Sequence, residues 1–383
     1  MKGTAIVIGG GIGGLAAAIG LRRTGWEVTV LERAASFGEI GAGMSQSPNA
    51  LRALDALGVG EPARSAGTPF HATDNIRLHD GRRLVRPQPG RTPPLLGFHR
   101  ADLHRVLLDA IPASNLRTGS EAVVERGTDG RFTVTADGTV HDADLIVAAD
   151  GVHSRSRTTV WPQAPRPKFW GNTVWRGVAE IDDTEGSMTL GPGHYFLLMP
   201  LPRGRVYWAL AGRAEREGIR YGDELAEVRR RVATWPPDIH AALDATAPET
   251  VLHHDMADLE RLPAFVRGNV ALLGDAAHAM HPDMAQGAAQ SLEDAVVLAA
   301  GLTAASDIES GLAAYDRARR PRTQTIVRQA RGKALMATTP SRIGYLLQTL
   351  PPRLVPSSRW PALAERALAP VWGWEPPVLA PAA

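Results

Sequence analysis

The residues of this sequence whose types and spacing could do chemistry are glycines and carboxylates that follow short apolar runs. The first set is the turn from Gly9 to Gly14 (GGGIGG), and Glu32 closes the next apolar run, 18 residues after Gly14. Glycines at this spacing let backbone N–H groups approach a pyrophosphate, and an acidic side chain at that position can accept hydrogen bonds from adenosine ribose hydroxyls. The spacing predicts a dinucleotide site.

Three glycines of the turn have separate predicted roles. Gly9 permits the tight turn, Gly11 brings backbone N–H groups to the pyrophosphate, and Gly14 lets the following helix pack closely on the strand. The N-terminus of that helix adds the positive end of its dipole. Glu32 and the adjacent Arg33 complete the cofactor-binding residues predicted at this turn.

The elements that must position the turn are predicted from the residues on either side of it. Residues 4–8 (TAIVI) form a β-branched run that is typical of a buried strand. Apolar residues then recur at helical spacing from Ile12 until Gly25 ends the segment, and residues 28–31 (VTVL) restore a strand. This order predicts a βαβ unit.

Two later strand ends carry carboxylates of the same kind. Residues 143–149 (ADLIVAA) predict a buried strand that ends at Asp150, and residues 270–273 (VALL) predict another that ends at Gly274-Asp275. Open α/β sheets place ligands at the carboxyl ends of their strands, where a carboxylate can hold a sugar or ribityl hydroxyl. Asp150 and Asp275 are therefore predicted to bind the cofactor.

A helix is predicted to begin at Gln286-Gly287 and to run to Leu302, after a turn that Pro282 stiffens. The N-terminus of such a helix can stabilise negative charge on the pyrimidine end of a reduced flavin. Gln286 and Gly287 join the predicted cofactor-binding residues, and these features favour a flavin as the ligand.

With these motifs the sequence resembles the group A flavoprotein monooxygenases, the family of para-hydroxybenzoate, salicylate and urate hydroxylases, from Lys2 to about Arg322. The resemblance implies that the turn from Gly9 to Gly14 holds the ADP half of FAD. It also implies that the DGxxSxxR segment from Asp150 to Arg157 serves both FAD and NAD(P)H, and that Gly274-Asp275 binds the ribityl chain.

Two more segments match the family, and one departs from it. Residues 41–60 and the HRADL run at 99–103 resemble family segments, and Arg100 matches the FAD-contacting arginine of the family. Where the family usually shows Pro-x-x-Gly-Gln-Gly, Ala285 stands in place of the first glycine. The departure is expected to alter flavin mobility or oxygen access.

The resemblance implies an α/β fold, with a Rossmann-type (GR2-like) FAD-binding domain, an inserted, mainly β substrate domain and a C-terminal helical tail. The expected boundaries are 1–70, 97–165 and 264–335 for the FAD-binding domain, 71–96 and 166–263 for the substrate domain, and 336–383 for a helical, Pro-rich segment.

The predicted substrate sheet contains strands at residues 170–181, 194–200 and 206–210. Tyr195 and Tyr207 lie on two of these strands and are the candidate pocket residues. The alternative for each is an ordinary half-buried aromatic residue. No catalytic acid or base can be assigned from the sequence.

By resemblance, NAD(P)H reduces bound FAD, dioxygen adds to give a flavin 4a-hydroperoxide, and its distal oxygen hydroxylates a small aromatic or heteroaromatic substrate. The sequence has one glycine fingerprint, so the reductant is expected to bind transiently, with Arg157 and its neighbours as candidates. NADH and NADPH both remain open.

Three other functions are alternatives to this one. A flavin halogenase shares the fold but carries a WxWxIP motif in mid-chain, whereas Trp372-Gly373-Trp374 lies at the terminus here. A non-redox FAD-binding isomerase or cyclase would consume no NAD(P)H. A simple NAD-dependent dehydrogenase would leave the segments at Asp150 and Asp275 without a ligand.

Composition excludes further classes. With 42 Lys+Arg against 40 Asp+Glu the net charge is only +2, so no nucleic-acid partner is expected. The absence of Cys excludes disulfides and thiolate chemistry, and the histidines show no metal-ligand spacing. The run Arg229 to Arg231 is predicted to be a solvated helix face. We expect a cytoplasmic monomer or homodimer with no membrane partner and no metal.

Overall fold

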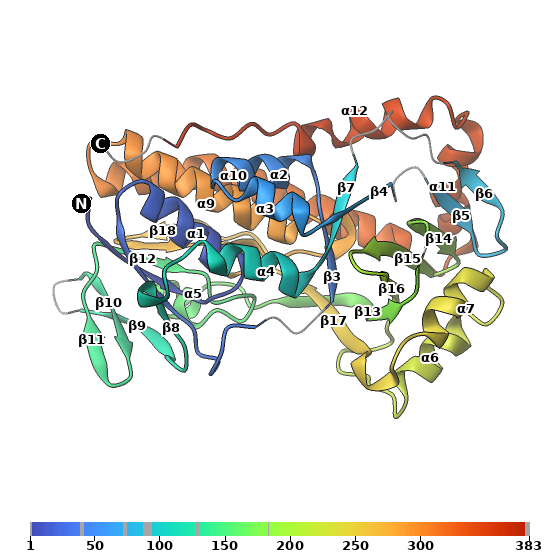
Figure 1. Cartoon of the computed structure of the whole chain (residues 1–383), viewed down its shortest axis with the longest axis horizontal. Helices are drawn as coiled ribbons and strands as arrows, with labels where there is room; N and C mark the ends of the chain where they lie inside the picture. The colour runs from blue at the N-terminus through green and yellow to red at the C-terminus, as the bar shows by residue number, and fades with distance from the viewer. Residues whose placement is uncertain are drawn as a thin grey trace.

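The computed structural model describes residues 2–38, 42–71, 75–86, 94–127, 130–182 and 184–379. Gly41, the first residue of the predicted segment 41–60, lies outside the described residues. The chain is mixed α/β, with a parallel sheet at one end of the molecule and a mainly antiparallel sheet at the other (Figure 1).

The first large sheet has six strands in the order β18-β19-β12-β1-β2-β8. Its strands are β1 (Thr4–Ile8), β2 (Glu27–Leu31), β8 (Leu116–Arg117), β12 (Leu145–Ala148), β18 (Val266–Arg267) and β19 (Val270–Leu272). All pairs are parallel except β18 with β19. Apolar runs such as β12 are buried along their length, as expected for a parallel sheet covered on both faces. The predicted βαβ unit and the Rossmann-type fold are confirmed.

Three helices stack beside this sheet: α1 (Ile12–Arg23), α9 (Gly287–Ala304) and α10 (Ile308–Ala337). Helix α1 packs on α9, and α9 packs on α10. Alanines at 16–18 and Gly20 let α1 approach closely, since a Cβ on Gly20 would lie 3.2 Å from the Ala295 carbonyl oxygen. Helices α1 and α9, which both have N-termini predicted to contact the cofactor, are therefore adjacent.

The second large sheet has seven strands in the order β17-β13-β16-β15-β14-β5-β6. They are β5 (Ile76–Leu78), β6 (Arg83–Val85), β13 (Lys168–Glu180), β14 (Ser187–Gly191), β15 (His194–Leu201), β16 (Arg205–Arg213) and β17 (Leu252–Asp258). Side chains alternate along β15, as a pleated strand requires. Phe196 and Leu198 join one buried cluster, and Tyr195, Leu197 and Met199 join the other.

Each face of this sheet packs against a different set of elements. One face packs on α6 (Glu224–Arg231) and α7 (Pro237–Asp244). The other, which carries Tyr195 and Tyr207, faces a small sheet of β3 (Gly43–Gln46), β4 (Thr68–Phe70) and β7 (Leu95–His99). The candidate pocket residues thus lie between two sheets.

Shorter elements fill the rest of the described chain. They are α2 (Pro48–Ala56), α3 (Gly60–Ser65), α4 (Arg100–Asp109), β9 (Ala122–Arg126), β10 (Phe132–Ala136), β11 (Thr139–His141), α5 (Arg155–Val160) and α8 (Asp275–His278), with short 3₁₀ turns at Ala113–Asn115, Pro248–Thr250 and Pro282–Met284.

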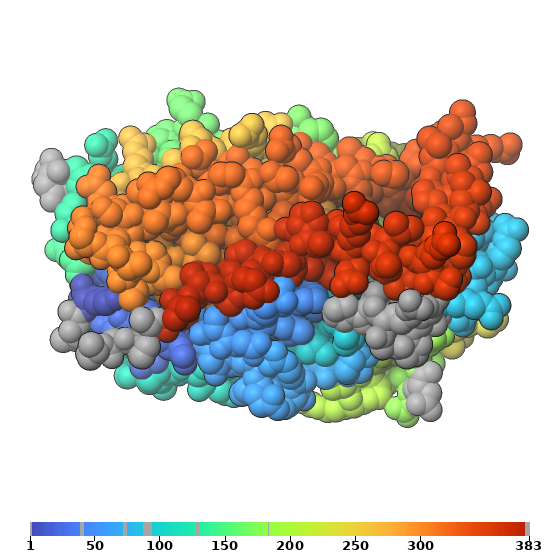
Figure 2. All heavy atoms as spheres, turned by 90° about the horizontal axis from the view of Figure 1, so that it is seen from above, coloured from blue at the N-terminus to red at the C-terminus, as the bar shows by residue number. Residues whose placement is uncertain are grey.

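The C-terminal segment is helical, as the sequence predicts, and forms α11 (Arg342–Leu354) and α12 (Trp360–Trp372). After α12 the chain returns along the molecule between α2 and the helices α9 and α10, and its last described residues lie at the end of the molecule that carries the parallel sheet (Figures 1 and 2). Arg52 donates to the Trp372 and Trp374 carbonyl oxygens, and Arg322 donates to those of Pro370 and Val371. Two arginines therefore fasten the tail to the core.

Candidate active site

The glycine turn has the geometry that the sequence predicts. Gly9 has φ +106°, and a Cβ on this residue would lie 2.4 Å from the Ala149 carbonyl oxygen. A Cβ on Gly14 would lie 1.9 Å from the Gly9 carbonyl oxygen. Gly11 caps α1 without a side chain, so no side-chain hydrogen bond occupies the first N–H groups of that helix. The turn and the helix N-terminus leave backbone donors for a phosphate.

Glu32 is held beside this turn at the end of β2. Its two carboxylate oxygens accept hydrogen bonds from the backbone N–H of Gly10 and of Ala34, each at 2.8 Å. A carboxylate has about four lone-pair positions, so two remain for ribose hydroxyls. The neighbouring Arg33 is exposed.

Asp150 follows β12 and presents a buried oxygen that has no partner among the described residues. One oxygen, Oδ2, accepts the backbone N–H of Ser156 at 3.0 Å, while Oδ1 is buried and has no hydrogen bond there. Gly151, next to it, borders open space. An unmade hydrogen bond of this kind costs free energy unless a ligand donor completes it. The feature fits a hydroxyl group of FAD.

Arg157 does not lie where a transient reductant could bind. Its side chain is 1% exposed, and its guanidinium donates to the Val152 and Ala276 carbonyl oxygens at 2.8 and 2.9 Å. Burial lowers the pKa of this arginine. Arg157 therefore links the segment after β12 to helix α8. The prediction that Arg157 binds the reductant is wrong.

Asp275 and the N-terminus of α9 lie close together. The Asp275 side chain is exposed, and a Cβ on Gly287 would lie 3.9 Å from its Oδ1. The side chain of Gln286 is buried and bound to Ser47, Asn49 and Gln290 at 2.8 to 3.0 Å. This end of α9 therefore offers backbone N–H groups, rather than the Gln286 side chain, to a flavin.

Arg100, which matches the FAD-contacting arginine of the family, is the first residue of α4 and directly follows β7. Its backbone N–H donates to the Ala42 carbonyl oxygen at 2.9 Å, which joins α4 to the chain just before β3. The carboxyl end of β7 and the start of β3 are therefore fixed relative to each other.

A charged network that the sequence analysis missed lies beneath the loop of Asp275. Asp294 accepts the backbone N–H of Gly274 at 3.0 Å and bonds to His278 and Arg319, each at 2.6 Å. Arg319 also bonds to Glu293 at 2.5 Å. Burial opposes ionisation of Asp294, but His278 and Arg319 together lower its pKa to about 2. In the sequence, the only sign of this network is the presence of polar residues within the otherwise apolar helix α9.

On the substrate side, Tyr195 and Asp283 form a hydrogen-bonded pair. The Tyr195 hydroxyl donates to Asp283 Oδ1 at 2.9 Å, and Asp283 Oδ2 has no partner among the described residues. Burial raises the pKa of Asp283 to about 6, and the bond from Tyr195 counteracts part of that effect. Asp283 can therefore exchange a proton near neutral pH.

Lys333 of α10 extends the pair into a group of three. Its side chain keeps accessible surface, yet the surrounding protein lowers the pKa of its ammonium group, while Asp283 raises it. Asp283, Tyr195 and the exposed Lys333 thus bring one carboxyl, one hydroxyl and one ammonium group near one another.

Tyr207 lines the same region from β16. Met199 on β15 pairs with Tyr207, and a Cβ on Gly43 of β3 would lie 2.3 Å from the Tyr207 ring. Burial raises the pKa of Tyr207, so the phenol stays neutral at physiological pH. The structure thus brings the two predicted tyrosines to one apolar cluster and adds Asp283 and Lys333, which the sequence analysis did not name as site residues.

Ala285 adopts the left-handed conformation, with φ 52° and ψ 36°. This conformation is disfavoured for residues with a Cβ, which explains why glycine suits this position of the motif. Ala285 follows the turn that carries Asp283 and precedes the N-terminus of α9.

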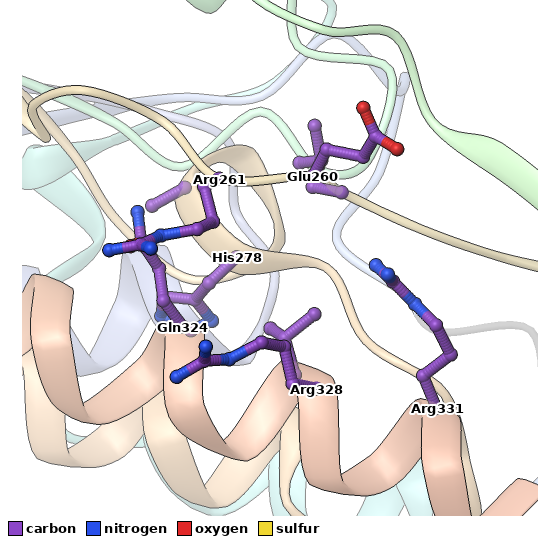
Figure 3. A pocket seen from close by; sticks show the side chains of 9 residues that line it. Glu260, Arg261, His278, Gln324, Arg328 and Arg331 are labelled. Carbon is purple, nitrogen blue, oxygen red and sulfur yellow. The ribbon is translucent and has the colours of Figure 1, made fainter.

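A cleft of about 370 Å³ borders the Gly274–Ala285 loop from the α10 side (Figure 3). It is lined by Leu259, Glu260, Arg261, Ala277, His278, Gln324, Val327, Arg328 and Arg331. Arg331 is bound to Asp258, whereas Arg261 and Arg328 reach only Gln324 and Thr325 within the described chain. The cleft therefore carries positive charge beside the loop.

The described residues contain no group of three or more His, Cys, Asp or Glu side chains that could hold a metal ion. No helix in the same part of the chain is both long enough and apolar enough to cross a bilayer.

Comparison with known proteins agrees with this geometry. A family model described as "FAD binding domain" matches residues 2–330. The FAD-dependent urate hydroxylase of Klebsiella pneumoniae is 33% identical over 347 residues, which cover 85% of this chain and 88% of that protein. The aurachin C monooxygenase/isomerase of Stigmatella aurantiaca is 33% identical over 335 residues, with 85% and 87% covered.

The solved structures give the same result. A Klebsiella pneumoniae protein crystallised with FAD and uric acid matches with a TM-score of 0.86 and 28% identity, over 96% of this chain and 97% of the other. The glycine turn, the orphaned oxygen of Asp150 and the uncapped helix N-terminus thus lie in a fold that binds FAD in this similar protein.

Proposed function

The chain belongs to the FAD binding domain family, among its FAD-dependent aromatic hydroxylases, and from this premise we propose that Asp283 and Tyr195 activate a hydroxylated aromatic substrate. The protein is an FAD-dependent monooxygenase that takes electrons from NAD(P)H. The proposal concerns which side chains serve the substrate and what kind of ring they accept.

The observation that carries the proposal is the bond from the Tyr195 hydroxyl to Asp283. A ring hydroxyl or ring N–H that donates to Tyr195 can pass its proton through the tyrosine to Asp283. Loss of that proton makes the ring more electron-rich and so more reactive toward an electrophilic oxygen. A pKa of about 6 lets Asp283 accept the proton at neutral pH and release it later.

Lys333 and Tyr207 have complementary proposed roles. The ammonium group of Lys333 can stabilise the anionic substrate that forms, because its charge interacts with that of Asp283, the proposed proton acceptor. Tyr207 and Met199 offer an apolar wall for a planar ring. We therefore expect a small aromatic or heteroaromatic substrate with one ionisable hydroxyl or N–H.

Bound FAD supplies the chemistry that no side chain here can supply, namely hydride acceptance from NAD(P)H and activation of dioxygen. Residues of the glycine turn, Glu32 and Asp150 would hold it, and the N-terminus of α9 would face its pyrimidine end. The two sheets around Tyr195 exclude water from the reacting ring. Because the reductant is a cytosolic metabolite, we place the enzyme in the cytosol.

The experiment is anaerobic reduction of the FAD-loaded enzyme by NADH and by NADPH, with and without a panel of aromatics. The panel pairs each phenol or heteroaromatic N–H compound with its O- or N-methyl ether. Faster bleaching of the flavin and oxygenated product with the free compound, but no product with its methylated partner, supports the proposal. Equal product from both members of a pair would refute the role of Asp283 as a base.

A further inference from the structure

Helix α11 turns its apolar side toward solvent. Ile343, Leu347 and Leu354 are 72%, 60% and 72% exposed, and Leu346 and Leu350 are exposed as well. Positions 343, 346, 347, 350 and 354 are spaced so that they fall on one face of a helix. The arrangement is the reverse of an ordinary surface helix, which buries this face.

The opposite face of α11 is anchored, so the helix cannot simply roll over to bury its leucines. Tyr345 stacks on His79 with ring centroids 6.2 Å apart, and its hydroxyl donates to the Leu190 carbonyl oxygen at 3.3 Å. Thr349 and Pro352 are buried on the same side. The apolar face is therefore held outward by contacts with the substrate sheet.

Basic residues accompany this face, and acidic ones are absent from the segment. Arg342, Arg353 and Arg359 are exposed, and none pairs with a carboxylate of the described residues. The sequence holds no Asp or Glu from residue 317 to residue 364. Asp80 and Arg82 interact electrostatically with Tyr345, on the anchored side of α11. The exposed face is therefore both apolar and positively charged.

Two further exposed apolar residues lie close to α11 in the sequence. Met336 at the end of α10 and Leu363 in α12 are 54% and 48% exposed. Soluble monomers rarely expose contiguous apolar areas of this kind without a binding partner. Helix α11 lies at the end of the molecule that also carries β5 and β6 (Figure 1).

We propose that this face docks on the surface of an anionic lipid bilayer. A helix with an apolar face and flanking arginines lies in the plane of the interface, with its leucines among the acyl chains and its guanidinium groups at the phosphates. A second copy of the chain fits less well, because symmetric pairing of this face would bring arginines together without carboxylates to compensate them.

The inference goes beyond the proposed function and differs from the expectation of no membrane partner. It concerns attachment to one leaflet and requires no spanning helix. It does not involve Asp283 or Tyr195, so its success or failure is independent of the proposed reaction.

The test uses the full-length, FAD-loaded protein and sedimentation with two kinds of vesicle. One kind is phosphatidylcholine alone, and the other contains phosphatidylglycerol at about one third of the lipid. Binding to the anionic vesicles that weakens as salt rises is the expected result. Ile343→Ser/Leu347→Ser/Leu354→Ser should abolish it, whereas Val140→Ser, which alters a residue of β11 that is 60% exposed, should not.

The contribution of charge is tested by a matched pair of substitutions. Arg353→Glu should weaken binding at least about fivefold. Arg216→Glu, which reverses an exposed charge far from α11 in sequence, should leave it unchanged. Both variants alter the net charge equally, so a difference in their vesicle binding shows that the position of the charge matters.

Two outcomes would overturn the proposal. One is equal sedimentation with neutral and anionic vesicles, or none with either. The other is a concentration-dependent dimer in analytical ultracentrifugation that the triple serine variant abolishes, because a second copy would then occupy the face.

Discussion

A single carboxyl group, that of Asp283, is buried in the described substrate region and has a raised pKa. Burial raises its pKa to about 6, so a fraction of the molecules carry a neutral side chain near physiological pH. The rate of product formation should rise with pH through about 6, because the base must be ionised to accept a proton.

Asp283→Asn should lower product formation by about 100-fold or more and remove the dependence on pH near 6. Reduction of the flavin by NAD(P)H should change little. The measurement is stopped-flow absorbance with product analysis between pH 5 and 8, and Asp182→Asn, at an exposed position, is the control. An unaltered pH profile would exclude Asp283 as the base.

The same substitution should stabilise the protein at high pH. Because the pKa of Asp283 is raised on folding, its contribution is most favourable below about pH 4 and is lost as pH rises through about 6. At pH 8 the free energy of unfolding of Asp283→Asn, measured by urea denaturation, should therefore exceed that of the wild type by at most about 3 kcal/mol. Near pH 4 the two proteins should have similar free energies of unfolding.

At Ala285 the backbone conformation can be tested separately from the chemistry. Ala285→Gly removes a left-handed Cβ and should stabilise the fold by up to about 1 kcal/mol, after allowing for the extra freedom of glycine when unfolded. Gly274→Ala should do the opposite, because its φ is +64° and the new Cβ would lie 2.7 Å from Ser291 Oγ. Thermal unfolding of both variants measures the difference, and a shift in the same direction for both would contradict this account.

At the scale of elements, the buried network of α9 and α10 fixes the loop that carries Asp275. Arg319 lies between Glu293 and Asp294, and all three side chains are buried. Removing the arginine would take one cationic partner from each carboxylate and leave Glu293 with Arg322 and Asp294 with His278. The loop held through Gly274 would then lose its support.

Arg319→Met should therefore cost about 3 to 5 kcal/mol of unfolding free energy at pH 7. Arg320→Met removes the neighbouring, partly exposed pair with Asp316 and should cost under about 1 kcal/mol. Urea denaturation compares them, and equal losses would show that burial of the network is unimportant. Ionised Asp294 stabilises the fold above about pH 4, and this stabilisation is lost as pH falls toward 2. The difference in unfolding free energy between Arg319→Met and Arg320→Met should therefore narrow in that range.

Elements with a local signature could be predicted from the sequence. The strand at residues 4–8, the glycine turn and the helix after Ile12 follow from β-branched runs and helical spacing over a few residues. The alternation that places Tyr195 and Tyr207 toward one cluster is equally local. The roles of Glu32, Arg100 and the other predicted FAD residues stay predictions.

Contacts between distant segments could not be predicted in this way. Asp283 meets Tyr195 across 88 positions of the chain, and Arg157 meets Ala276 across 119. The run at Arg229 to Arg231 was predicted to be solvated, but the Arg231 side chain is only 14% exposed, bonds to Glu227 and lies 4.5 Å from the Trp175 ring centroid. Tertiary packing overrides composition at such positions.

At the scale of the whole molecule, the tail is fastened to the core by few groups. Arg52 binds the carbonyl oxygens of Trp372 and Trp374, and Arg322 joins the tail to Glu293 of the buried network. Trp374 and Leu379 also pack against the main apolar core, so the tail is held by these two side chains and by the bonds of the two arginines.

Arg52→Met should therefore speed proteolytic cleavage within residues 373–379 several-fold while leaving the flavin spectrum unchanged. Arg64→Met removes an arginine of the adjacent helix that pairs with Asp55 and does not touch the tail, so it serves as the control. Limited proteolysis followed by mass spectrometry distinguishes them. Equal cleavage rates would mean that other contacts hold the tail.

The strand order of the parallel sheet has a consequence for synthesis. Strand β1 is complete by residue 8, but its neighbour β12 ends at residue 148, and the next strand, β19, ends at residue 272. A chain emerging from the ribosome N-terminus first can pair β1 with β2 early, but the other edge of β1 stays unpaired until β12 is made, and β12 then waits for β19. We expect such nascent chains to depend on chaperones and to capture FAD only near the end of synthesis.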